Sequence, residues 1–260
     1  MITTAIRIDD SRWQEWLEPV AATTRLRNIE CDATLVTTEP NFSKALAKAG
    51  IACVHARDIL PPETASFLAN ADDDKDFNDL KKSLVNTMLA AEAERTTHFS
   101  LQLRLDDPQP DNEARIRKNA AFLKKILLVP LENPFCLDIQ IRAPWHFPKS
   151  NEWSRAMQIC KTADSRRIGL NLQFHPNEYD EQPDPNQLLD EAGPFLHAIA
   201  FHYAPRLGDT LFDDELADWA DALKQRQFNG IVTFCPHATK DEDLIQICNT
   251  ATNWSDFFTD

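Results

Sequence analysis

Six short runs of alternating apolar residues each end at a proline, and this repeated ending constrains the fold more than any other feature of the sequence. The six prolines are Pro40, Pro108, Pro144, Pro176, Pro205 and Pro236. Proline lacks the amide proton that a β-ladder requires, so it marks the point where a strand leaves a sheet. Because segments with helical periodicity lie between the runs, the sequence predicts a repeated alternation of strand and helix.

This alternation predicts a barrel. The predicted strands are Thr4–Ile8, Ala33–Thr37, Ile51–Ala56, Phe99–Leu105, Phe135–Arg142, Ile168–His175, Ala198–Tyr203 and Ile231–Cys235. The predicted helices are Asn41–Ala49, Phe77–Glu94, Asn112–Leu128, Glu152–Ala163, Asp214–Gln227 and Asp241–Thr250. About eight strands in 260 residues match the ~250 residues of a (β/α)8 TIM barrel, and an open doubly wound sheet is the alternative. No break in composition divides the chain, so we expect residues 1–260 to form one barrel domain.

The strand faces favour the closed barrel. Strands that are covered by helices on both faces usually read as near-continuous apolar runs. Here Asp138, Gln140 and Arg142 alternate with apolar residues, and the predicted fourth and sixth strands alternate in the same way. In a closed barrel the apolar residues would face the outer helices and the polar residues would point inward. Buried polar groups must then pair with one another, with water or with a ligand.

The composition narrows the partners. The chain has 27 Lys and Arg against 41 Asp and Glu, a net charge of −14. Nucleic acids and anionic membranes carry the same sign of charge, so neither is expected as a main partner. No stretch approaches the ~18 apolar residues of a membrane span, and residues 1–10 lack the core of a signal peptide. We therefore expect a cytoplasmic protein that binds a small molecule.

Two residue types exclude further classes of site. The sequence has 5 glycines, whereas about 18 are expected at the ~7% average usage, so Gly-rich phosphate loops are excluded. The 6 cysteines show no Cys-x-x-Cys spacing. In a chain of this length they indicate reduced, mostly buried thiols rather than a disulfide framework.

Three segments carry a resemblance to a known superfamily. Arg167–Pro176, His197–Pro205 and Phe228–Pro236 resemble the last three strands of xylose-isomerase-like TIM barrels, and the similarity extends from about Leu80 to the C-terminus. That superfamily includes sugar isomerases and epimerases and apurinic endonucleases. The resemblance implies a divalent metal held by four side chains, whose positions here are Gln140, Gln173, His202 and Cys235. Of these four positions only His202 keeps the residue of the family pattern.

These replacements bear on a metal cofactor. Hard cations such as Mg²⁺ or Mn²⁺ prefer anionic oxygens, which two amides, an imidazole and a thiol do not supply. A softer Zn²⁺ could instead use Cys235 with His175, His202 and His237, which all lie at predicted strand ends. The alternative is that Cys235 is a small buried residue and the histidines are hydrogen-bonded parts of the core.

The same strand ends carry the candidates for catalysis. Active sites of such barrels lie at the carboxyl ends of the strands. His202 and His175 are therefore the predicted general bases, and His237 is a predicted contact to the substrate. The alternative is that a histidine beside a strand-ending proline caps a backbone group. Asp138 and Asp106 could form an acid–base pair, or could neutralise neighbouring arginines.

Further polar and aromatic residues are predicted to bind the substrate. Arg57, Arg104 and Arg142 end three successive predicted strands, and their forked donors suit a carboxylate or phosphate. The alternative is internal ion pairing with Asp58, Asp106 or Asp138. Gln140 and Gln173 are predicted to contact the same ligand. Trp145 could stack against a sugar or could cover the core.

The leading hypothesis is a sugar or sugar-acid isomerase or epimerase. In such a reaction a base, His202 or His175, removes a proton next to a carbonyl while Arg104 and Arg142 hold the anion. The alternative is a catalytically silent protein on the same fold that binds a small molecule or serves as a partner subunit. An endonuclease would need a metal cluster and a basic groove, and a net charge of −14 does not favour the groove. The sequence leaves the substrate and the oligomeric state open.

Overall fold

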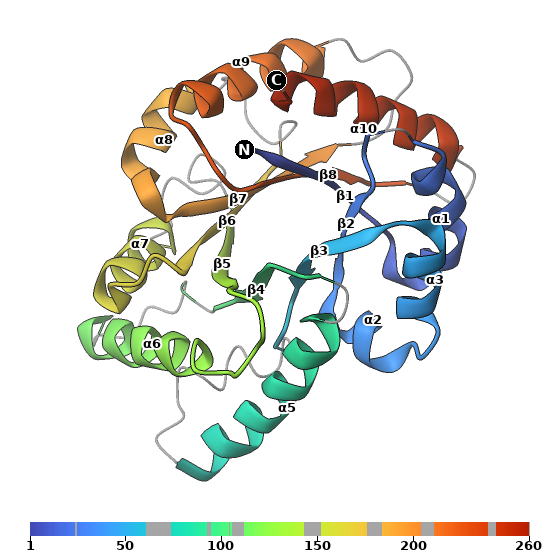
Figure 1. Cartoon of the computed structure of the whole chain (residues 1–260). Coiled ribbons are helices and arrows are strands. Elements are labelled where there is room, and N and C mark those ends of the chain that lie inside the picture. The colour runs from blue at the N-terminus through green and yellow to red at the C-terminus, as the bar shows by residue number, and fades with distance from the viewer. Residues whose placement is uncertain are drawn as a thin grey trace.

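Eight parallel strands close into a ring that is surrounded by helices (Figure 1). The architecture is that of a computed structural model, which describes residues 1–23, 25–60, 74–92, 95–103, 105, 112–142, 152–175, 184–203, 211–238 and 243–259. Each strand pairs with the next along the chain, and β1 (Thr3–Arg7) closes the ring against β8 (Ile231–Pro236). The predicted (β/α)8 barrel is confirmed.

The remaining elements follow the predicted alternation. The other strands are β2 (Asn28–Asp32), β3 (Ala52–Arg57), β4 (His98–Gln102), β5 (Cys136–Arg142), β6 (Ile168–Phe174) and β7 (Leu196–Tyr203). The helices in the described ranges are α1 (Trp13–Ala22), α2 (Ala33–Thr38), α3 (Phe42–Ala49), α5 (Asp74–Glu92), α6 (Asn112–Ile126), α7 (Glu152–Ala163), α8 (Pro185–Ala192), α9 (Leu211–Gln225) and α10 (Leu244–Phe258). None of these helices is long and apolar enough to cross a membrane.

One predicted strand is wrong. The segment Ala33–Thr37 lies within helix α2, and strand β2 ends just before it. The β-branched residues of this segment favour a strand. However, the side chain of Asp32 accepts a hydrogen bond from the backbone N–H of Thr34 at 2.8 Å. Such a cap stabilises a helix start by about 1 kcal/mol, which outweighs a weak strand preference over so short a segment.

The main apolar core lies between the barrel and its helices. Phe174 of β6 and Phe201 of β7 pack against Trp219 of α9, with ring centroids 5.3 and 5.7 Å apart. On the opposite face of the sheet, Gln140 Nε2 of β5 donates to Ser100 Oγ of the neighbouring strand β4 at 3.0 Å. The prediction that apolar residues face the helices while polar residues point inward is therefore confirmed for these strands.

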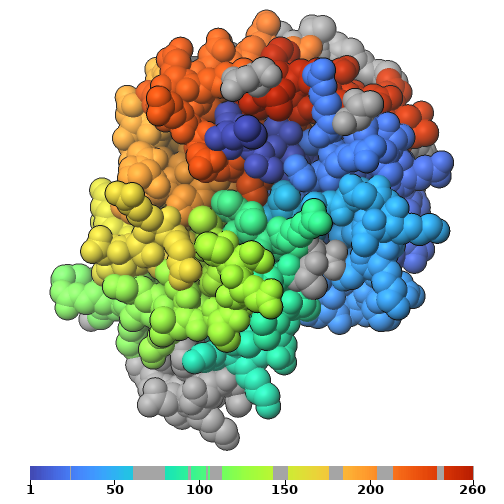
Figure 2. All heavy atoms as spheres, viewed as in Figure 1, coloured from blue at the N-terminus to red at the C-terminus, as the bar shows by residue number. Residues whose placement is uncertain are grey.

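The interior of the ring is filled. Ala5, Ala198 and Ile231, on β1, β7 and β8, form a small apolar cluster inside the barrel. Figure 2 shows one face of the molecule, on which atoms of the first and middle parts of the chain (blue and green) meet over the centre of the ring. In the described part of the chain, no hollow on this face leads into the barrel (Figure 2).

Candidate functional site

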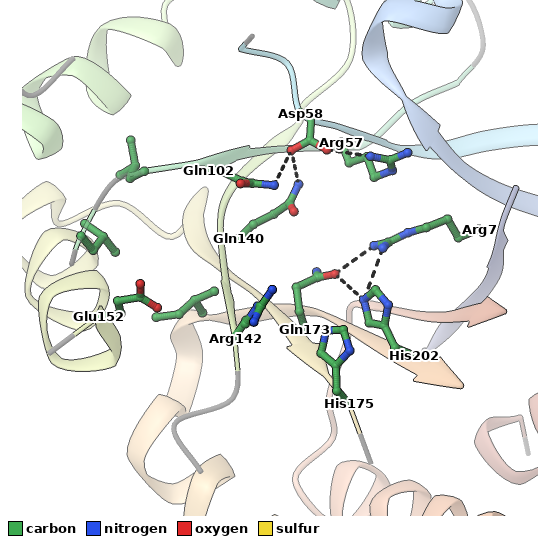
Figure 3. Close-up of a pocket in the computed structure, with 13 residues that line it drawn as sticks. Arg7, Arg57, Asp58, Gln102, Gln140, Arg142, Glu152, Gln173, His175 and His202 are labelled. Atoms are coloured by element: carbon green, nitrogen blue, oxygen red, sulfur yellow. Dashed lines mark hydrogen bonds and ion pairs between the residues drawn. The ribbon is translucent and has the colours of Figure 1, made fainter. Parts of the chain in front are cut away.

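A cavity of about 570 Å³ opens at the carboxyl ends of the strands. Its lining includes side chains from six different strands or from the residues just after them (Figure 3): Arg7, Arg57, Gln102, Gln140, Gln173 and His202. A volume of this size is typical of small-molecule sites, which range from about 300 to 1,000 Å³. The strand ends therefore form one polar pocket in the place where TIM barrels carry their active sites.

The floor of the pocket contains a buried ion pair. Arg7 Nε donates to Glu30 Oε1 at 2.6 Å, and the other carboxylate oxygen of Glu30 lies 3.0 Å from His55 Nδ1. Glu30 is fully buried. Burial alone would raise the pKa of Glu30, but the charges of Arg7 and His55 hold it well below its ordinary value. Glu30 therefore remains a carboxylate, and Arg7 is its charged partner.

The guanidinium of Arg7 fixes the orientation of two further side chains. Its Nη2 donates to Gln173 Oε1 at 3.0 Å, and Gln173 Nε2 donates to Asn171 Oδ1 at 2.9 Å. Because a guanidinium has only donors, the amide must turn its oxygen toward Arg7. The same oxygen lies 2.9 Å from His202 Nε2, which therefore carries a proton and donates it. His202 Nδ1 is then the acceptor, and it lies 3.3 Å from His237 Nε2.

His202 is a neutral imidazole at pH 7. Burial first, and then the charge of Arg7, lower its pKa from 6.5 to about 2. A conjugate acid of that strength gives up its proton readily, so His202 offers hydrogen bonds in this environment rather than proton uptake near neutral pH.

In the pocket wall beside β3, carboxylates pair with Arg57 and accept hydrogen bonds from two glutamines. Arg57 forms an ion pair with Asp10, lies 2.7 Å from Asp58 Oδ2, and has Asp32 Oδ2 at 3.6 Å. Asp58 Oδ1 in turn accepts hydrogen bonds from the amides of Gln140 at 3.0 Å and Gln102 at 3.2 Å. Arg57 therefore forms the internal ion pairs of the alternative interpretation, with Asp58 as one partner, and because it also lines the pocket its contact with a ligand stays a prediction.

Most predicted site residues meet at this pocket. The described candidates that line it are Arg57, Gln140, Arg142, Gln173, His175 and His202. His237 is exposed and adjoins His202, with ring centroids 5.3 Å apart. Arg104, Asp106 and Trp145 lie outside the described residues. Asp138 is not part of the pocket lining in the described chain, because its carboxylate is paired with His197 Nδ1 at 2.7 Å nearer the amino ends of the strands.

Three important residues were missed by the sequence analysis: Arg7, Glu30 and His55. Arg7 is a charged residue between Ile6 and Ile8, which is the same inward-polar signal that was used for later strands. Glu30 was missed because the second strand was placed after it rather than around it.

The three histidines of the pocket are a possible metal-binding group. Ligand atoms of His175, His202 and His237 lie within 4.8 Å of one another. However, the rings of His175 and His202 are stacked, with centroids 4.0 Å apart and planes 14° apart. An imidazole lone pair lies in the plane of its ring. Because the two ring planes are nearly parallel, the lone pairs of His175 and His202 do not converge on one point, and one ring must rotate before both could bind one ion. Cys235 is not in the group, and burial raises the pKa of its thiol to about 12.

The pocket floor does not fit a hard divalent cation. Gln140 and Gln173 contribute neutral oxygens, and the Glu30 carboxylate is already engaged by Arg7 and His55. The Arg7 Nη1 atom lies 3.3 Å from His202 Nε2, where a metal bound to that nitrogen would meet a positive charge. Unit charges about 4 Å apart repel by about 4 kcal/mol at an effective dielectric constant of 20, and a dication doubles this cost.

No protein-family model and no curated protein matches this sequence. Solved structures match along nearly the whole chain. A xylose isomerase domain protein from Alicyclobacillus acidocaldarius has a TM-score of 0.71 at 10% identity, with 99% of this chain and 98% of that chain covered. D-psicose 3-epimerase, solved in the presence of D-fructose, has a TM-score of 0.70 at 15% identity, with 98% and 97% covered.

A third match, the IOLI protein solved with a zinc atom, has a TM-score of 0.67 at 13% identity and covers 98% of both chains. At these identities the matches establish the fold. The chain folds as a xylose-isomerase-like TIM barrel, as the resemblance predicted.

Proposed function

We propose that this protein binds a sugar or a sugar acid in the pocket at the carboxyl ends of the barrel strands. The observation that carries the proposal is the convergence of amide, carboxylate and guanidinium groups from separate strands on one cavity of about 570 Å³. Sugar hydroxyls both donate and accept hydrogen bonds, so they match a surface that offers donors and acceptors side by side. The epimerase of the same fold that was solved with D-fructose supports this ligand class.

The charges of the pocket favour hydroxyl groups over phosphate. Arg7 is paired with Glu30, and Arg57 is surrounded by Asp10, Asp32 and Asp58. These pairs cancel most of the net charge that would attract a dianion, whereas a guanidinium N–H group can still donate to a single ligand oxygen. Arg142 lines the pocket at the end of β5, where it would contact the carboxylate of a sugar acid.

Isomerisation or epimerisation is the second candidate, and the placement of His175 favours it. His175 lines the cavity and stacks on His202. We assign the proton-accepting role to His175, whereas His202, held by Arg7 and Gln173, would position it. The base would remove a proton next to the sugar carbonyl, and the fixed donors of the floor would stabilise the enediolate. A silent binding protein is the alternative outcome of the same experiment.

The test combines binding with exchange of a carbon-bound proton. Calorimetry with D-fructose, D-allulose, D-xylose and D-gluconate measures binding, and NMR in D₂O detects deuterium incorporation into a bound sugar. We expect binding of at least one of these compounds and loss of at least about tenfold in affinity for Gln140→Leu. The matched control is Gln158→Leu, which changes an exposed glutamine on the outer helix α7.

The reaction class is tested by His175→Asn. We expect this variant to bind the sugar but to lose deuterium exchange. Binding without exchange in the wild-type protein would support the silent alternative, and no binding of any of the four compounds would refute the proposed function.

A further inference from the structure

The positive charge on the pocket floor is carried by a side chain of the protein, the guanidinium of Arg7. Arg7 is the last residue of β1, and its side chain extends across the floor toward Gln173 and His202 (Figure 3). The side chain is 18% exposed and lines the cavity, so one edge of the guanidinium is accessible to a ligand.

Arg7 is fixed in this position by the residues behind it. Glu30 accepts from Arg7 Nε at 2.6 Å and is itself fully buried. If the guanidinium moved away, a buried carboxylate would lose its main partner, which is strongly unfavourable. The floor therefore presents a preorganised cation rather than a mobile side chain.

One nitrogen of this guanidinium faces an atom that does not accept its protons. Gln173 Oε1 accepts from both Arg7 Nη2 and His202 Nε2, so the latter nitrogen is protonated. Arg7 Nη1 lies 3.3 Å from that same nitrogen. A protonated ring nitrogen has no lone pair to offer. Among the described residues, no other acceptor contacts Nη1, which leaves its N–H groups for a ligand oxygen.

We propose that Arg7 supplies the fixed positive charge of this site and binds an oxygen of the sugar through Nη1, so that the pocket works without a divalent cation. The inference rests on the proposed sugar binding and follows from the poor fit of the floor to a metal. The oxygen concerned is a hydroxyl or carbonyl oxygen, and in an isomerase it is the one that becomes negative in the enediolate.

The first experiment removes the ion pair as a unit. In Arg7→Met/Glu30→Gln both charges are lost, so no buried carboxylate is left unpaired. The control Arg226→Met/Asp190→Asn removes an exposed pair at 2.6 Å near α8 and α9, away from the cavity. Calorimetry with D-fructose is run after dialysis against EDTA and again with added Mn²⁺. We expect the wild type and the control to bind equally under both conditions, and the Arg7 double variant to lose at least about tenfold in affinity.

The second experiment uses no sugar and tests whether the guanidinium of Arg7 occupies the position that a metal ion could otherwise take. Arg7→Ala leaves the Glu30 carboxylate and Gln173 Oε1 beside the vacated space, and His202 Nε2 can join them once its proton moves to Nδ1, a donor set that suits Mn²⁺. Equilibrium dialysis followed by metal analysis should then find about one Mn²⁺ per chain in Arg7→Ala and none in the wild type. The matched variant Arg7→Ala/Glu30→Gln lacks the carboxylate and should take up none.

The outcomes separate this inference from the proposed function. It is overturned if the wild type holds stoichiometric Mn²⁺ and loses D-fructose binding with EDTA, or if Arg7→Met/Glu30→Gln binds D-fructose as tightly as the wild type. If the wild type binds no sugar, the proposed function fails. The Mn²⁺ experiment then tests by itself whether Arg7 takes the place of a divalent cation. Uptake by Arg7→Ala but not by the wild type supports Arg7 as the built-in cation, whereas equal uptake by both, or by neither, refutes it.

Discussion

The barrel interior holds an acid–base pair near each end, and the two pairs differ in what lies beside them. At the carboxyl ends of the strands, Arg7 and Glu30 form the pocket floor. Near the amino ends, His197 Nδ1 lies 2.7 Å from Asp138 Oδ1, and the two side chains are 11% and 0% exposed. The first pair adjoins the cavity, whereas neither residue of the second pair is in its lining in the described chain.

The pair near the amino ends, Asp138 and His197, is called the lower pair here, and Arg7 and Glu30 the upper pair. The lower pair is charged and has close neighbours on adjacent strands. Burial would lower the pKa of His197, but the charge and hydrogen bond of Asp138 raise it to about 10. His98, whose ring centroid lies 6.4 Å away, stays neutral because burial lowers its pKa to about 4. Gly169 contacts His197 from the neighbouring strand, where a side chain would overlap the imidazole.

A buried ion pair does not by itself indicate a functional site, because a pair can be buried at either end of the barrel. Near the amino ends, the Asp138 carboxylate is fully buried and pairs through Oδ1 with His197, and neither residue is in the pocket lining of the described chain. At the carboxyl ends, Arg7 lines a cavity, and with His202 Nε2 protonated as assigned above, Arg7 Nη1 keeps N–H groups that this nitrogen does not accept. We therefore expect changes to the lower pair to affect folding and changes to the upper pair to affect ligand binding.

The largest effect is expected from Asp138→Asn. This change leaves the buried His197 without its counter-charge and should lower the free energy of unfolding by about 3–5 kcal/mol. Urea unfolding measures the loss, and Asp138→Asn/His197→Gln should recover most of it because neither charge remains. The folded fraction of Asp138→Asn should still bind D-fructose like the wild type, and loss of that binding would contradict the division between the two ends.

The two ends should also lose stability at opposite ends of the pH range. The folded pKa of His197, about 10, lies above its ordinary value of 6.5. Its contribution is therefore complete below about pH 6.5 and is lost as the pH rises toward 10. The pKa of His202 is lowered to about 2, so the unfolded chain takes up a proton that the folded chain refuses, and stability falls as the pH drops below 6.5.

Each of these changes amounts to about 1.4 kcal/mol per pH unit. Unfolding measured between about pH 5 and pH 9 should show a flatter alkaline arm in Asp138→Asn/His197→Gln. His202→Asn should flatten only part of the acid arm, because the lowered pKa of His98 contributes to the same arm. If each variant flattened the other arm, the assignment of the two histidines would be reversed.

A smaller loss in the free energy of unfolding is expected from a substitution at Gly169, whose backbone lies against His197 of the lower pair. A Cβ at Gly169 would lie 2.4 Å from His197 Nδ1 and 2.5 Å from the Phe195 carbonyl oxygen. Gly169→Ala should therefore destabilise by about 1–3 kcal/mol and should weaken the alkaline arm, because the imidazole must shift away from Asp138. The control is Gly193→Ala, whose Cβ meets nothing within 4 Å but whose φ of +53° disfavours a side chain. It should cost about 1 kcal/mol and leave the pH dependence unchanged.

The sequence predicts the barrel well because its signal is repeated. Alternation and strand-ending prolines recur along the chain, so the misplacement of one strand at Ala33–Thr37 did not alter the fold class. That error arose because a single capping residue, Asp32, decided between helix and strand. Polar residues on well-placed strands, such as Gln140 and Gln173, line one pocket, and their contact with a ligand stays a prediction.

The partners of those residues could not be predicted, because they depend on register around the closed ring. Arg7 on the first strand meets Gln173 on the sixth and His202 on the seventh, and this contact exists only after β1 pairs with β8. Likewise, Asp138 and His197 are 59 residues apart in sequence and lie on strands separated by β6. A single sequence shows the polar residues but not which of them neutralise one another.

The smallest effect on stability is expected from Gln102→Ala in the pocket wall. This substitution at the carboxyl ends should affect ligand binding more than folding. Gln102 is exposed, and its amide donates to Asp58 Oδ1 at 3.2 Å, an oxygen that also accepts from Gln140 at 3.0 Å. Because Asp58 keeps this second donor and Arg57, Gln102→Ala should change the free energy of unfolding by less than about 0.5 kcal/mol. The lost hydrogen bond to a sugar should nevertheless lower D-fructose affinity about five- to tenfold in calorimetry. Gln158→Ala on α7 is the matched control, and a stability loss in Gln102→Ala as large as that of Gly169→Ala would show that the wall serves the fold rather than the ligand.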